Sequence, residues 1–141
     1  MSAPAPAARR VNVRTPEVME RVQAEVETHY RSVIVEKIRA QGSMLTIGGT
    51  TVRLARDFGF CYGVERAIDL AYAARKVFAD RRVYLLGEII HNQEVNRQLT
   101  EMGVVSIPVS EHESTIAKLT NEDVVIVPAF GAETRLMKLI S

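Results

Sequence analysis

The sequence contains a single cysteine, Cys61, among its 141 residues. A lone cysteine cannot form an internal disulfide, so the chain is not a small secreted fold held by disulfide bridges. The sequence also lacks an excess of charge of either sign, because 18 basic residues nearly balance 17 acidic ones. No apolar run approaches the roughly 20 residues that a membrane-spanning helix requires. We therefore expect neither nucleic acid nor a membrane as a partner.

The overall composition is that of a globular domain, with 47% hydrophobic and 25% charged residues. Residues 1–15 differ from the rest, because they are rich in Ala, Pro and Arg and precede the first acidic residue, Glu17. They lack the apolar stretch of a secretory signal. We expect a disordered tail over 1–15, with an organelle transit peptide as the less favoured interpretation.

Residues 16–50 are predicted to form an N-terminal extension made of a helix and a β-hairpin. Apolar residues recur at spacings of three and four from Val18 to Ile38, which predicts one long helix ending near Gly42. Two β-prone runs then flank Gly48 and Gly49. A Gly-Gly pair between such runs is typical of a hairpin with a primed turn.

From residue 51 the pattern alternates between strands and helices. Strand patterns occur at 51–55, 83–86, 104–107 and 124–127, with helices after the first, second and fourth and a short helix at 114–119. This alternation predicts an α/β fold with a parallel sheet and flanking helices. The helix from Glu133 has no stop signal before Ser141, and we expect residues 51–141 to be a lobe truncated at its C-terminus.

Three distinctive segments follow strand patterns, at 59–63, 88–92 and 128–132. Ligands of open α/β sheets bind beyond the carboxyl ends of the strands. We therefore expect the three segments to meet at one edge of the sheet. Other ligand-binding patterns are missing from the sequence: it has neither a phosphate-binding P-loop nor a second cysteine for a redox pair.

Cys61 is the first candidate in these segments. It precedes a predicted helix, whose N-terminal end favours the thiolate that attacks substrates or binds metal. Gly59 and Gly63 on either side allow tight turns and close approach of a bulky ligand. The plain alternative is a buried, inert cysteine.

The second candidate is His91, which precedes Asn92 and a predicted helix. It could donate to an anion together with helix N–H groups, or it could simply cap the helix. We expect Glu88 to form an ion pair with an arginine rather than to act as a general acid or base. His29 and His112 lie among polar residues and are predicted to be solvated.

Three stretches, taken in order, resemble the family of 4-hydroxy-3-methylbut-2-enyl diphosphate reductases: RLARDFGFCYGVERAIDLAY, GEIIHNQEVNRQLTEMGV and EDVVIVPAFGAETRLMKL. The helix and hairpin extension is similar to that of the cyanobacterial and plant-type branch. The resemblance implies the first of three α/β lobes around a 4Fe–4S cluster. It also implies the last step of the methylerythritol phosphate pathway, with ferredoxin or flavodoxin as electron donor.

Carried over residue by residue, the resemblance makes Cys61 the first of three cluster cysteines and His91 a contact to the substrate diphosphate. Gly59 and Gly63 would let the backbone approach the cluster. Phe130 stands where many members have histidine, and phenylalanine is typical of the plant-type branch. Because the other two cysteines are absent, we expect this chain alone to hold no stable cluster and to be inactive. The expected location is the bacterial cytoplasm, or otherwise the plastid stroma.

Two other functions are compatible with the residues. The chain could be a stand-alone α/β module that binds an anion or metal, or a subunit completed by a partner chain. It could also be a thiol enzyme with Cys61 as nucleophile and His91 as base.

Overall fold

The structure is a computed structural model that describes residues 10–140. Its helices are α1 (Pro16–Tyr30), α2 (Val33–Ala40), α3 (Tyr62–Val77), α4 (Gln93–Glu101), α5 (His112–Ile116) and α6 (Thr134–Ile140), with a 3-10 turn η1 (Val109–Glu111). Its strands are β1 (Met44–Ile47), β2 (Thr50–Arg53), β3 (Val83–Leu86), β4 (Val104–Ile107) and β5 (Val124–Ile126). Within the described residues no helix is long and apolar enough to cross a membrane.

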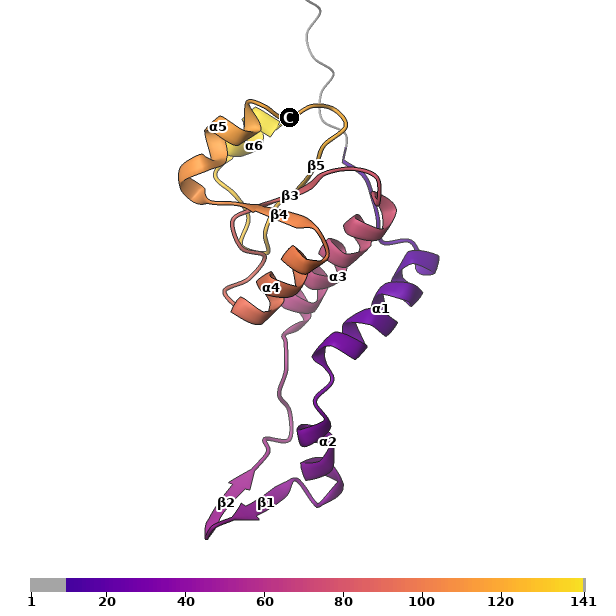
Figure 1. Cartoon of the computed structure of the whole chain (residues 1–141), viewed down its shortest axis with the longest axis vertical. Helices are drawn as coiled ribbons and strands as arrows, with labels where there is room; N and C mark the ends of the chain where they lie inside the picture. The colour runs from indigo at the N-terminus through magenta and orange to yellow at the C-terminus, as the bar shows by residue number, and fades with distance from the viewer. Residues whose placement is uncertain (1–9, 141) are drawn as a thin grey trace, which may run out of the picture.

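The centre of the lobe is a three-stranded parallel sheet in the order β4-β3-β5. Side chains alternate between the two faces of a strand. Val83 and Leu85 of β3 accordingly enter one hydrophobic cluster, whereas Tyr84 and Leu86 contact a second cluster. Helices α3 and α4 lie on one side of the sheet, and α5 and α6 lie on the other (Figure 1). The predicted α/β fold with a parallel sheet and flanking helices is confirmed.

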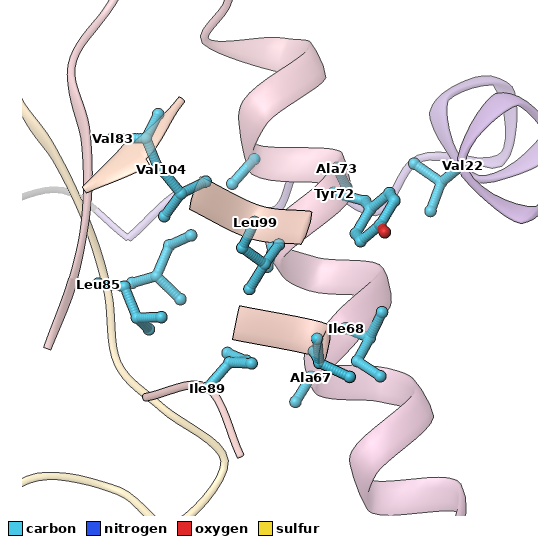
Figure 2. Packing of buried hydrophobic residues seen from close by; sticks show 14 of the residues in the cluster. Val22, Ala67, Ile68, Tyr72, Ala73, Val83, Leu85, Ile89, Leu99 and Val104 are labelled. Carbon is cyan, nitrogen blue, oxygen red and sulfur yellow. The ribbon is translucent and has the colours of Figure 1, made fainter. Parts of the chain in front are cut away.

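The larger cluster joins the sheet to α3, α4 and α1. Ile68 and Tyr72 of α3 are fully buried in it, together with Leu99 of α4 (Figure 2). Val22 of α1 packs beside Tyr72 from the outer side of α3. Helix α1 therefore forms a third layer, which packs against α3 rather than against the sheet.

The smaller cluster closes the opposite face of the sheet with α5 and α6. Its buried residues are Leu86, Ile107, Ile116 and Leu136. The helix predicted at 114–119 begins earlier, because η1 leads directly into α5. This placement buries His112, whose Nε2 lies 3.0 Å from the carbonyl oxygen of Ile107. The prediction of a solvated His112 is therefore wrong.

The long N-terminal helix of the prediction is two helices. Arg31 and Ser32 have extended backbone angles between α1 and α2. The hydroxyl of Ser32 accepts a hydrogen bond from the amide of Val35 and caps α2. Apolar spacing continues through this break, so spacing alone did not reveal it, whereas a serine cap offers the backbone a local alternative to the helix.

The predicted hairpin is present, and it includes residues that were also assigned to the parallel sheet. Strands β1 and β2 pair antiparallel, with Ile47 opposite Thr50 and positive φ angles of 55° and 82° at Gly48 and Gly49. This is the geometry of a primed two-residue turn. Strand β2 pairs only with β1 among the described residues, so the prediction that 51–55 begins the parallel sheet is wrong. The hairpin and α2 project away from the lobe (Figure 1).

The start of the described chain packs against α3. Val13 is buried in the larger cluster. Arg14 forms an ion pair with Asp69 across 3.8 Å between guanidinium and carboxylate. Packing of the chain on the lobe therefore begins before residue 16, and residues 1–9 of the expected tail lie outside the described residues.

Candidate functional site at the carboxyl edge of the sheet

The helix starts of α3 and α4 lie at the carboxyl edge of the sheet. Helix α3 ends at Val77 and β3 begins at Val83, so the end of α3 lies at the amino edge. A helix of 16 residues spans about 24 Å, more than the roughly 13 Å of a four-residue strand. The start of α3 therefore reaches the carboxyl edge. Two residues separate the end of α4 from the start of β4, so the end of α4 also lies at the amino edge and its start lies toward the carboxyl edge.

The loop that follows β3 is held rigidly at this edge. Asn96, in the first turn of α4, accepts a hydrogen bond from the amide of Ile89 at 3.2 Å and donates one to the carbonyl of Ile90 at 2.8 Å. Asn92 caps α4 through the amide of Val95. Ile89 is buried next to Ala67 and Ile68 of α3 (Figure 2). The loop is thus fixed beside the first turns of α3.

His91 is the exposed residue of this fixed loop. Its side chain is 82% exposed, and its Nδ1 lies 3.0 Å from Oε2 of Glu88. The Nε2 edge of the ring has no partner among residues 10–140. Asn92 rather than His91 caps the helix. Among residues 10–140, Glu88 pairs with this histidine and with no arginine, so the predicted Glu88–arginine pair is wrong.

The turn after β5 lies against the same loop. The amide of Ala129 donates to the carbonyl of Ile89 at 3.2 Å. The rings of Phe130 and His91 stack, with centroids 5.1 Å apart and an angle of 18° between their planes. Two of the three segments expected at this edge are therefore in direct contact. No pattern in the sequence predicted the stacked pair.

Cys61 is the exposed N-cap residue of α3. Its thiol makes no hydrogen bond to the helix, and in the described part of the chain none joins it to His91. Gly59 has a positive φ of 129°, which a residue with a side chain rarely adopts. A Cβ atom added at Gly59 or Gly63 would meet no atom within 4 Å other than its chain neighbours and, for Gly63, the backbone of its own helix. The thiol is therefore accessible, and the space around its flanking glycines is open.

The described residues do not form a metal centre by themselves. Across residues 10–140, no group of three or more His, Cys, Asp or Glu side chains is arranged to hold a metal ion. Cys61 fits a metal cluster as one accessible thiol with room beside it, and a cluster needs further protein ligands.

His29 lies away from this edge and contacts α3. Its Nδ1 is 2.8 Å from the hydroxyl of Tyr72, which donates in turn to Oε1 of Gln98 at 3.1 Å. Burial raises the pKa of Tyr72 far above its ordinary value, so this hydroxyl stays protonated. His29 is exposed, as predicted, and its contact with Tyr72 joins α1 to α3 and α4.

The fold and this edge define an α/β lobe with an exposed thiol and an exposed imidazole at the carboxyl ends of a parallel sheet, which is where ligands of such sheets bind. A family model described as LytB protein matches residues 52–141. The chain belongs to the LytB family.

Several similar curated proteins are named 4-hydroxy-3-methylbut-2-enyl diphosphate reductase. One from a Nostoc species is 43% identical over 120 residues, which is 85% of this chain and 30% of that protein. One from a Synechococcus species is 45% identical over 122 residues, 86% of this chain and 31% of the relative. One from Gloeobacter violaceus is 42% identical over 123 residues, with shares of 84% and 30%.

The resemblance to this family that the sequence indicated is confirmed. The chain spans about 30% of the length of the curated relatives that it matches. No solved structure matches the chain.

Proposed function

We propose that this chain forms the first lobe of a 4-hydroxy-3-methylbut-2-enyl diphosphate reductase. The observation that carries the proposal is the exposed Cys61 thiol at the start of α3, at the sheet edge where His91 also lies. The names of the relatives supply the reaction class. The reaction is the reductive removal of the hydroxyl of an allylic diphosphate, which consumes two electrons and two protons, releases the hydroxyl as water and yields isopentenyl and dimethylallyl diphosphates.

Cys61 would supply one thiolate to a 4Fe–4S cluster. Its sulfur is accessible, and the open space at Gly59 and Gly63 allows the backbone to approach a bulky inorganic group. When bound, the cluster supplies the electrons that the reduction needs. Cys61 is the only cysteine of the sequence, so the remaining thiolates would come from polypeptide outside these 141 residues.

His91 would bind the diphosphate of the substrate. Nδ1–H donates to the carboxylate of Glu88, and with the imidazole carrying its second proton Nε2–H is left to donate to a phosphate oxygen. Helix α4 begins two residues after His91 in the sequence, and backbone N–H groups at a helix N-terminus favour anions. The role of this side chain would be to hold the substrate by its charged end.

The electron donor would be ferredoxin or flavodoxin. The reduction consumes two electrons, and these proteins would deliver them one at a time. The cyanobacterial sources of the relatives support a bacterial cytoplasm as the location.

The test is a chimera in which this chain replaces the matching region of the Nostoc relative. The chimera is reconstituted anaerobically, and iron content and diphosphate product are measured. We expect about four irons per chain and turnover. Cys61→Ser should lose most of the iron and the turnover, whereas Ser110→Ala, an exposed change on η1, should leave both intact. A Cys61→Ser chimera with full iron content and undiminished turnover would overturn the proposal.

A further inference from the structure

Phe130 is a large apolar side chain without a structural task in the lobe. It is 68% exposed and belongs to neither hydrophobic cluster. Exposing an aromatic ring to water forgoes the stabilisation that its burial would bring. Its ring contact is with His91, an even more exposed side chain. Packing of the core therefore does not explain the position of Phe130.

The backbone holds the two rings in register. The amide of Gly131 donates to the carbonyl of Pro128 at 2.9 Å, which closes a turn around Phe130. The amide of Ala129 then ties this turn to the carbonyl of Ile89, in the loop of His91. Because both segments are fixed, the stacking is built into the edge and does not depend on a flexible tail.

Glu88 and Phe130 restrain different movements of the imidazole. The carboxylate of Glu88 holds one edge of the ring through Nδ1. The nearly parallel ring of Phe130 restricts rotation out of the stacking plane. With both contacts in place, Nε2 is the free edge, and its direction is set before a ligand arrives. An exposed side chain that is already ordered loses less conformational entropy on binding.

We propose that Phe130 is a positioning residue that orients the His91 imidazole toward a diphosphate. The inference rests on the proposed function, because it takes His91 as the diphosphate contact, and it adds a residue that acts through His91 without touching the anion itself. Phe130 cannot donate a hydrogen bond. Its contribution would therefore be seen in how tightly His91 binds.

The experiment uses the 141-residue chain and inorganic pyrophosphate as the probe. NMR records the contacts between the rings of His91 and Phe130, and a pyrophosphate titration followed at the His91 ring protons gives a Kd. Phe130→Leu keeps an apolar side chain but removes the ring, and Phe130→Tyr retains the ring. Phe58→Leu is the matched control, because Phe58 is another exposed phenylalanine and its ring faces Arg39.

We expect contacts between the two rings in the unsubstituted chain. Phe130→Leu should weaken pyrophosphate binding about three- to ten-fold, the range of an aromatic pair contact. Phe130→Tyr should restore binding, and Phe58→Leu should leave it unchanged. Circular dichroism should give the same helix content for all variants.

The possible failures are distinct. A Kd for Phe130→Leu equal to that of the unsubstituted chain overturns the positioning role while His91 keeps its place in the proposed function. Missing contacts between the rings overturn it as well. If pyrophosphate causes no change at His91 in the unsubstituted chain, the diphosphate contact itself is wrong, and the inference falls with it.

Discussion

Asn96 and Ile90 are joined by a hydrogen bond of 2.8 Å from the side-chain amide of the asparagine to the backbone carbonyl of the isoleucine. The same asparagine accepts a hydrogen bond from the amide of Ile89. One side chain therefore fixes the Ile89 amide and the Ile90 carbonyl, in the loop just before His91. The position of the exposed imidazole therefore depends on a residue in the following helix.

Replacing Asn96 with Ala is expected to loosen this loop. The change leaves a backbone amide and a carbonyl without their partners, which costs about 1–2 kcal/mol in the free energy of unfolding. Urea unfolding measures this loss, and hydrogen exchange at the Ile89 amide should become faster. Gln93→Ala, an exposed change in the same helix, serves as control. Equal exchange rates at Ile89 in both variants would contradict the assignment.

The hydroxyl of Tyr72 links three helices, because it contacts His29 of α1 and donates to Gln98 of α4. Tyr72→Phe leaves the buried Gln98 without its donor and should lower the free energy of unfolding by about 1–3 kcal/mol. Thermal unfolding provides the measurement. Tyr62→Phe removes an exposed hydroxyl whose hydrogen-bond partner within residues 10–140 is Arg66, and it should change the Tm little. Equal effects of the two substitutions would show that the link across the helices adds nothing.

Asp123 is expected to make stability depend on pH at the acid end. Burial acts to raise its pKa, but hydrogen bonds from the Thr120 amide and the Arg82 guanidinium outweigh burial and hold the pKa below its ordinary value. A carboxylate with a lowered pKa stabilises the fold above its unfolded pKa of about 3.9, and this stabilisation disappears as pH falls through the folded pKa.

Asp123→Asn should therefore be less stable than the unsubstituted chain near pH 7, and the difference should shrink below about pH 4. Urea midpoints across this pH range test the expectation. Glu122→Gln removes the same charge from the neighbouring exposed residue and should show a much smaller pH-dependent difference. A difference for Asp123→Asn that stays constant with pH would contradict the assigned role.

Much of the lobe was predictable because its elements have strong local signals. The apolar runs at 83–86 and 104–107 became β3 and β4 unchanged, and the position of Cys61 before a helix was also read correctly. The strand predicted at 51–55 is present as β2 but does not join the parallel sheet, because alternation describes a hairpin edge as well as a sheet strand. Only pairing with β1 decides between them.

The site was predictable in its residues and not in its contacts. Its glycines, Cys61 and His91 stand out in the sequence as chemical types. Three contacts depend on how separate segments meet in three dimensions: the stacking of His91 on Phe130, the pair of His91 with Glu88, and the hydrogen bonds from Asn96 to the loop. Such contacts leave no periodic pattern in a single sequence, so reasoning from spacing could not find them.

The central claim is that Cys61 and His91 share one edge of the sheet, and the sole cysteine allows a direct measurement. A nitroxide attached to Cys61 in the native chain broadens nearby NMR signals, and the broadening falls steeply with distance. We predict ready labelling without denaturant and stronger broadening at His91 than at the Phe78 amide, at the other end of α3. Stronger broadening at Phe78 than at His91, or a thiol that reacts only in denaturant, would contradict the account.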